Sequence, residues 1–122
     1  MADLTTVGQG APNTSANAWP VYDGGGTTGT NTSVASAAAD TLLLVANVNR
    51  KGATIYNDSN TGQLYVLLGT TVASNANFTV LLDKAGGGPG IGGYYEVPFG
   101  YTGQIRGIWS VASGNARITE IT

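Results

Sequence analysis

The stretch Ala53-Thr54-Ile55-Tyr56-Asn57-Asp58-Ser59-Asn60-Thr61-Gly62-Gln63-Leu64-Tyr65-Val66-Leu67-Leu68 contains two short apolar runs on either side of a polar segment. Residues 57–62 are of the types that form Asx turns or tolerate left-handed backbone conformations. Short runs rich in β-branched, aromatic and aliphatic side chains, bounded by such turns, are typical of β-strands. The stretch therefore predicts two strands joined by a hairpin or a corner.

The same pattern repeats along the chain from residue 41 onward. Residues 34–44 resemble a helix only because they are rich in alanine, so we expect little helix. Short strands at regular intervals favour an all-β protein: a single antiparallel β-sandwich, jelly-roll-like or immunoglobulin-like, with about seven short strands. The predicted strands lie at residues 42–46, 53–56, 64–68, 78–82, 94–97, 105–109 and 116–121.

Two of these runs are apolar on both faces. Residues 64–68 and 80–82 lack the alternation of polar and apolar side chains that a strand with one solvent-facing side shows. Either loops of this chain cover the second face, or another subunit covers it. The sequence leaves both readings open.

Residues 1–40 differ in composition from the rest of the chain. They contain no Lys or Arg and few aliphatic side chains, so this segment cannot bury enough apolar surface to fold alone. The exception is Trp19-Pro20-Val21-Tyr22, where large rings flank a proline that suits an extended strand. We expect residues 1–40 to form an extended N-terminal arm, with a disordered tail as the alternative, and residues 41–122 to form the β-sandwich domain.

Composition and charge exclude several classes of function. The chain has 122 residues, enough for one domain, and contains neither Cys nor His, so thiol and imidazole nucleophiles and ligands are absent. Only 10% of the residues are charged and the net charge is −2, which gives no cationic field for nucleic acid. The longest aliphatic run is far shorter than the roughly twenty residues of a membrane-spanning helix. We expect no enzyme, cofactor, metal, nucleic acid or membrane, and no secretory signal.

Three local motifs suggest chemistry, but their contexts favour structural roles. Residues 88–93 contain the G-x-G-x-x-G spacing of dinucleotide-binding loops, yet a strand rather than a helix follows them. Residues 58–62 begin like a calcium-binding loop but lack its closing Glu. Asp83 and Glu96, on what should be adjacent strands, could form a carboxylate pair of the kind glycosidases use. We expect a flexible loop, a turn and two ordinary surface carboxylates.

Segments in order along the chain carry a resemblance to a known family. Three of them are Asn49-Arg50-Lys51-Gly52-Ala53-Thr54-Ile55-Tyr56-Asn57-Asp58-Ser59, Gly93-Tyr94-Tyr95-Glu96-Val97-Pro98 and Gly114-Asn115-Ala116-Arg117-Ile118-Thr119-Glu120, with residues 64–69, 101–103 and 108–109 between them. Together they resemble a module of small virion structural proteins of tailed bacteriophages, and residues 10–21 resemble a segment common upstream of it. The chain departs from the family pattern at residues 86–93, where related proteins pass directly into the Gly-Tyr-Tyr strand.

The resemblance implies a non-enzymatic building block of a virus particle. A compact β-domain with an arm fits a capsid decoration (cement) protein, which binds the outer capsid surface and stabilises the shell by bridging major capsid subunits. The implied partners are the phage major capsid protein and other copies of this chain, in a homo-oligomer of closed symmetry such as a trimer. The implied location is the capsid surface of the virion, after synthesis in the host cytoplasm.

Within this interpretation, eight residues are candidate interface residues. Trp19 and Tyr22 anchor the arm, Arg50 and Lys51 form a basic hairpin tip against an acidic shell, and contacts between copies come from Tyr94, Tyr95, Phe99 and Tyr101. Tyr and Trp suit such interfaces because they combine a large apolar area with one polar group.

The same aromatic side chains suit a second interpretation. In it the protein is a neck, tail or fibre component, and exposed Tyr and Trp side chains contact host surface glycans. A third class, a small hydrolase acting through Asp83 and Glu96, is favoured by no other residue. Copy number in the particle and saturable sugar binding separate the first two interpretations.

Overall fold

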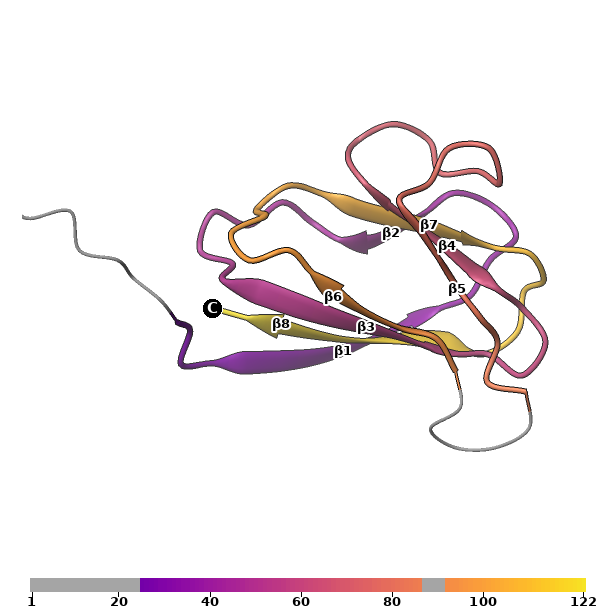
Figure 1. Cartoon of the computed structure of the whole chain (residues 1–122), viewed down its shortest axis with the longest axis horizontal. Helices are drawn as coiled ribbons and strands as arrows, with labels where there is room; N and C mark the ends of the chain where they lie inside the picture. Colours follow the sequence, from indigo (N-terminus) through magenta and orange to yellow (C-terminus); the bar gives the residue numbers. More distant parts are fainter. Residues whose placement is uncertain (1–24, 87–91) are drawn as a thin grey trace, which may run out of the picture.

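The structure of the chain, a computed structural model, describes residues 25–86 and 92–122 (Figure 1). These residues form eight β-strands and no helix. No helix in this part of the chain is therefore long and apolar enough to cross a membrane. The strands are β1 (Gly29–Ala35), β2 (Thr41–Leu44), β3 (Gly52–Asp58), β4 (Leu64–Leu68), β5 (Val80–Leu82), β6 (Tyr94–Val97), β7 (Ile105–Trp109) and β8 (Asn115–Ile121).

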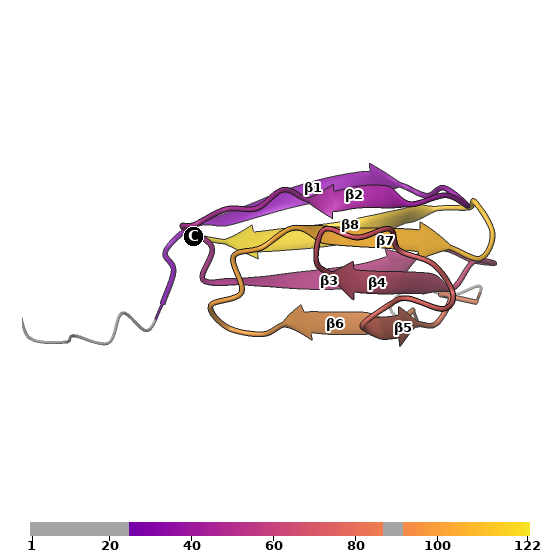
Figure 2. The ribbon, with the colours of Figure 1, turned by 90° about the horizontal axis from the view of Figure 1, so that it is seen from above.

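The strands form two four-stranded antiparallel sheets that lie face to face. Sheet A has the order β1-β8-β3-β6 and sheet B has the order β2-β7-β4-β5. Seen from above, β1 and β2 lie along one side of the molecule, and β5 and β6 lie along the other (Figure 2). This arrangement confirms the predicted antiparallel β-sandwich. Because β3 and β4 belong to different sheets, the turn at residues 59–63 is a corner and not a hairpin.

All seven predicted strands are present, with small shifts at their ends. β2 ends two residues earlier than expected, at Leu44, and β5 begins two residues later, at Val80. The eighth strand, β1, was not predicted, because residues 29–35 were assigned to the arm. The arm boundary at residue 40 is therefore wrong for these residues. Every β1 residue except Val34 is exposed, so the strand depends on backbone pairing with β8 and leaves no apolar pattern in the sequence.

The core lies between the two sheets and follows the alternation of the central strands. In β3 and β7 every second residue is buried, which is the period expected of strands that face a core on one side. The fully buried apolar side chains, each at most 2% exposed, include Ile55, Leu64, Val66, Ile105, Trp109, Ala116 and Ile118.

The outer face of β4 is covered by the chain's own loop between β4 and β5. Tyr65 on β4 makes an edge-to-face contact with Phe78 of that loop, with ring centroids 5.0 Å apart. Thr79 donates its backbone N–H to Val66, and its hydroxyl accepts from the N–H of Leu68. Of the two readings of this doubly apolar strand, the structure therefore supports burial under a loop.

A buried asparagine joins the two sheets at the end of the sandwich opposite the C-terminus. The Asn57 amide donates to the carbonyls of Gly62 (2.8 Å) and Asp83 (2.9 Å), and its oxygen accepts from the Trp109 indole N–H at 3.1 Å. At the same end Gly114 has φ of 74°, and a side chain there would meet the carbonyl of Asp58. These contacts fix the turns that join the sheets.

Candidate interaction surface

Two loops and the chain terminus gather at one end of the sandwich, which we call the C-terminal end. It consists of residues 45–51 between β2 and β3 and residues 98–104 between β6 and β7, joined to each other by backbone hydrogen bonds. Beside them the N–H groups of Thr27 and Thr28 both donate to the carbonyl of Thr122. The beginning of the described chain and its last residue therefore meet at this end (Figure 1).

Arg50 holds the C-terminal end together from the inside. Its side chain is fully buried, and its Nε donates to Glu120 Oε2 at 2.7 Å. The two terminal nitrogens donate to the carbonyls of Gly103 (2.7 Å), Tyr101 (3.3 Å) and Val45. A buried guanidinium requires this degree of pairing. The prediction of an exposed basic tip is thus wrong for Arg50, whose charge is internal and joins both loops to β8.

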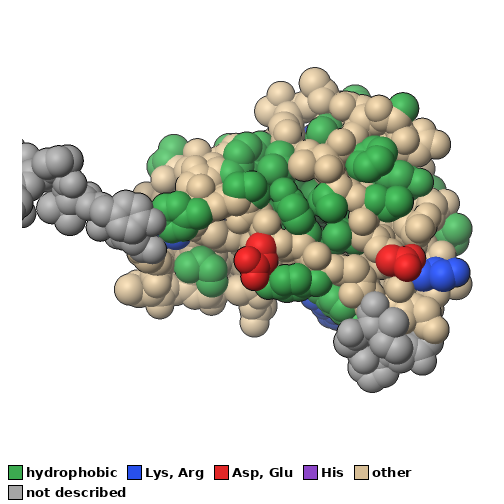
Figure 3. Space-filling model, in the orientation of Figure 1, with side chains coloured by type: hydrophobic (Ala, Val, Ile, Leu, Met, Phe, Trp, Pro, Cys, Tyr) green, Lys and Arg blue, Asp and Glu red, His purple; other side chains and the backbone are tan. Residues whose placement is uncertain are grey.

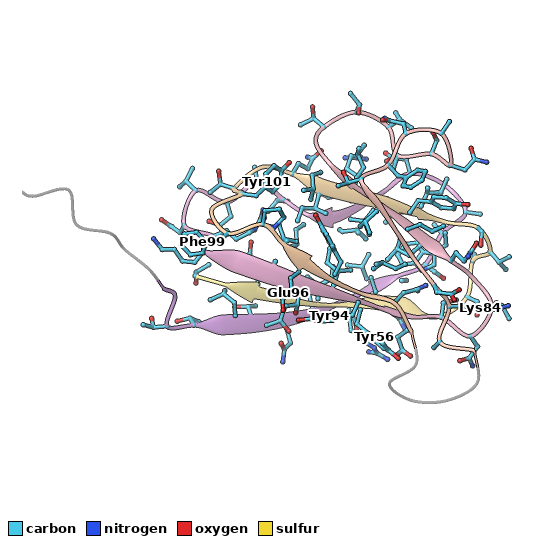
Figure 4. The ribbon with its side chains drawn as sticks, in the orientation of Figure 1. Tyr56, Lys84, Tyr94, Glu96, Phe99 and Tyr101 are labelled. Atoms are coloured by element: carbon cyan, nitrogen blue, oxygen red, sulfur yellow. The ribbon has the colours of Figure 1, made fainter. Side chains whose placement is uncertain are left out.

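Lys51 and Phe99 lie next to each other on the outside of the same end. Together with Glu96 and Ile121 they line a shallow depression of about 280 Å³. Phe99 is 56% exposed, and its side chain projects from the loop that follows β6 (Figure 4). The structure therefore brings these two predicted interface residues onto one surface.

Three exposed apolar side chains lie on the two loops of the C-terminal end, and we call them the apolar rim: Val45, Val48 and Phe99. Val45 is 60% exposed and Val48 is 87% exposed. Sequence reasoning missed both valines, because Val45 was assigned to a strand that in fact ends at Leu44. A signal for Val48 was present, since it stands between two asparagines in a polar turn, where no core position is available.

The tyrosines of the predicted interface divide between the core and the surface. Tyr95 and Tyr101 pack against the core, and the Tyr101 hydroxyl donates to the carbonyl of Gln104 at 2.8 Å. Tyr94 is 57% exposed and donates to Glu96 Oε2 at 3.1 Å. Partial desolvation and this hydrogen bond raise the pKa of the Tyr94 hydroxyl. Only Tyr94 of the three is free to contribute most of its ring to a partner.

A second surface of interest is the outer face of sheet A. Tyr56 lies opposite Tyr94 on one neighbouring strand and opposite Arg117 on the other. A shallow depression of about 600 Å³ lies over β1, β3 and β8 and is lined by Tyr56, Arg117, Ile118 and uncharged polar residues. The Arg117 guanidinium is half-exposed and pairs with Asp58 at 2.8 Å.

Two further predictions concern the other candidate residues. Trp19 and Tyr22 lie outside the described residues, as does most of the glycine-rich loop. Asp83 and Glu96 were expected on adjacent strands, which is wrong: β5 and β6 are edge strands of different sheets. The two carboxylates have separate local partners, the N–H of Lys84 for Asp83 and the Tyr94 hydroxyl for Glu96.

The surface is poor in charge on the face shown in Figure 3, where hydrophobic and uncharged polar side chains predominate. Within residues 25–86 and 92–122 there is no group of three or more acidic side chains placed to hold a metal ion. Comparisons with family models, with curated proteins and with solved structures found no match to this chain.

Proposed function

We propose that this protein is a non-enzymatic virion structural protein: a capsid decoration, or cement, protein that binds the outer surface of a phage shell and bridges major capsid subunits. The observation that carries the proposal is the apolar rim of Val45, Val48 and Phe99 at the C-terminal end. Exposed apolar side chains on the loops at one end of a small domain are typical of surfaces that become buried against another protein. The resemblance to phage virion proteins supplies the identity of the partner.

The position of the rim fits an arm that works together with the domain. Residues 27 and 28 are bonded to Thr122 at this end, so the described part of the chain begins there, and residues 1–24, which carry Trp19 and Tyr22, precede it in the sequence. In the proposed complex the rim contacts one shell subunit, and residues 1–24 contact the same subunit or its neighbour across a seam. Such a contact adds interface area without changing the sandwich itself.

The rim is also held rigidly, which favours binding. Arg50 joins both rim-bearing loops to β8 through charged and carbonyl hydrogen bonds. Every buried side-chain nitrogen and oxygen in the described part of the chain has a hydrogen-bond partner. A surface fixed before binding loses little conformational entropy when it docks. The proposed partners are the major capsid protein and other copies of this chain.

Heat stability of the particle tests this proposal. Particles prepared without this chain should release their DNA at a lower temperature than complete particles, and adding the purified protein should restore the difference. The control is an equal amount of protein with Val48→Ser and Phe99→Ser. If the purified protein neither binds the particles nor changes the release temperature, the proposal is wrong.

One observation favours a second candidate, a neck, tail or fibre component that contacts host glycans. The depression on the outer face of sheet A is shallow, has both polar and apolar lining, and contains Tyr56, which stands opposite the exposed Tyr94 on the neighbouring strand. Aromatic rings and polar groups on a flat face suit neutral sugars. Saturable binding of a host polysaccharide that is lost in Tyr94→Ala would favour this candidate over decoration.

A further inference from the structure

β1 is a long edge strand with an open side. It pairs with β8 over its full length, from Gly29 opposite Ile121 to Ala35 opposite Asn115, without a register shift. No described strand pairs with its other side. About half of the N–H and C=O groups of such an edge strand point away from the sheet and can accept a further strand.

This edge lacks the features that protect sheet edges in soluble proteins. Natural edge strands are usually very short, bulged, charged or interrupted by proline. The other three edges of this sandwich are short: β2 has four residues and an irregularity between Leu42 and Leu44, β5 has three residues and β6 has four. β1 has seven residues, Gly-Thr-Asn-Thr-Ser-Val-Ala, with no charge, proline or bulge.

From length and chemistry we infer that the occupant of this edge is β1 of a second copy, paired antiparallel about a two-fold axis at Thr32. Among the described edges, only β1 has the seven residues that cover β1 completely. Residues that stand opposite each other in a sheet point to the same face. Two identical antiparallel strands related by a two-fold axis must therefore pair so that one residue stands opposite its own copy. Full overlap of residues 29–35 then places that residue at position 32.

The side chains that meet in this register are compatible. Thr32 meets its own copy, and Thr30 meets Val34 of the second copy, so β-branched side chains pair on one face. On the other face Asn31 meets Ser33 of the second copy. Asn31 and Ser33 are held on that face by hydrogen bonds from Thr119 and Arg117, respectively. No charge stands opposite a like charge, and the two copies of sheet A become one continuous eight-stranded sheet.

The proposed function includes association between copies of this chain, and the β1 pairing identifies the surface through which they associate. The pairing itself does not depend on shell binding. One strand pair covers less area than the roughly 1,200–2,000 Å² of a stable protein–protein interface. The dimer is therefore weak in dilute solution and becomes populated at high local concentration of the protein. The dimer is tested with the isolated protein, without shells. If the protein does not form the dimer, the shell-binding proposal is unaffected and is judged by its own experiment.

Sedimentation of the full chain over a wide concentration range tests the pairing. The wild type should show a reversible monomer–dimer equilibrium. Thr32→Lys and Thr32→Asp should each weaken it at least tenfold, because like charges then stand opposite each other. A 1:1 mixture of the two variants should restore the dimer. Asn60→Lys, an equal charge change in an exposed turn away from β1, is the control and should have no effect.

Cysteine substitution provides a second readout, because the chain contains no cysteine. Oxidation of Thr32→Cys should give a covalent dimer in at least tenfold higher yield than oxidation of Asn60→Cys. A trimer insensitive to Thr32→Lys, or equal cross-linking of the two cysteine variants, would overturn the inference. Either result would mean that copies associate through another surface, or that residues 1–24 pair with this edge in place of a second copy.

Discussion

Arg50 Nε donates a hydrogen bond of 2.7 Å to Glu120 Oε2, although the two residues are 70 positions apart in the chain. The arginine side chain is fully buried and the glutamate side chain is 17% exposed. The remaining donors of the guanidinium bind carbonyls of the two loops that carry the apolar rim. One internal ion pair therefore fixes the shape of the surface that we propose docks on the shell.

Removal of Arg50 should destabilise the fold strongly. Arg50→Ala leaves Glu120 without its cation and three carbonyls without a donor, so we expect a loss of about 3 kcal/mol in the free energy of unfolding. Urea unfolding measures this loss. Lys84→Ala removes the same charge from an exposed position and should change stability by less than about 0.5 kcal/mol. Equal stability of the two variants would show that Arg50 does not hold the loops.

The ion pair between Asp40 and Arg106 should make stability depend on pH in the acid range. The side-chain hydrogen bond from Arg106 holds the pKa of Asp40 below its ordinary value of 3.8, helped by the N–H of Ala73 and opposed by partial burial. Because the folded-state pKa is lowered, this contribution to stability is complete above the unfolded-state pKa. It is lost as pH falls from about 3.8 through the lower folded-state value.

Asp40→Asn provides the measurement for this pair. The stability difference between wild type and Asp40→Asn should be constant above about pH 5 and should shrink as pH falls below 4. The asparagine oxygen can still accept from Ala73, so the change reports mainly on the ion pair. A difference that stays constant down to pH 2 would contradict the assignment.

The buried hydrogen bond between Trp109 and Asn57 should contribute measurably to stability. Trp109→Phe removes the indole N–H and leaves the Asn57 oxygen buried without a donor, which should cost about 1–3 kcal/mol in addition to the lost packing. Thermal unfolding of the wild type, Trp109→Phe and a variant with 3-benzothienylalanine at position 109 separates the two effects, because the benzothienyl ring keeps the shape of the indole but lacks its N–H. If the benzothienyl variant is as stable as the wild type, the cost of Trp109→Phe is packing alone.

The apolar rim should determine binding to the shell. Val48→Ser removes a side chain that is 87% exposed, so it should leave the unfolding temperature unchanged while weakening binding to shells. With Phe99→Ser added, we expect at least about a tenfold loss of affinity in co-sedimentation. The matched control is Val111→Ser in the turn before β8, at the opposite end of the sandwich. Equal losses in control and rim variants would place the binding surface elsewhere.

The sequence predicts those elements whose side chains alternate between core and surface. It does not predict elements that depend on backbone pairing or on a partner far away in the chain. Ile105 to Trp109 alternate between core and surface, so this strand was predicted with its correct bounds. β1 was missed because it buries almost no side chain and exists through its register with β8. The sequence predicts a surface position for Arg50 because its partner, Glu120, is brought to it only by the fold.

The copy number of this protein in purified particles, measured against the major shell subunit by quantitative gel densitometry, tests the decoration proposal most directly. Decoration of the lattice predicts a ratio close to that of the shell subunit, or a simple fraction of it. A ratio of a few per cent would contradict decoration and would place the protein at the neck, the tail or a fibre.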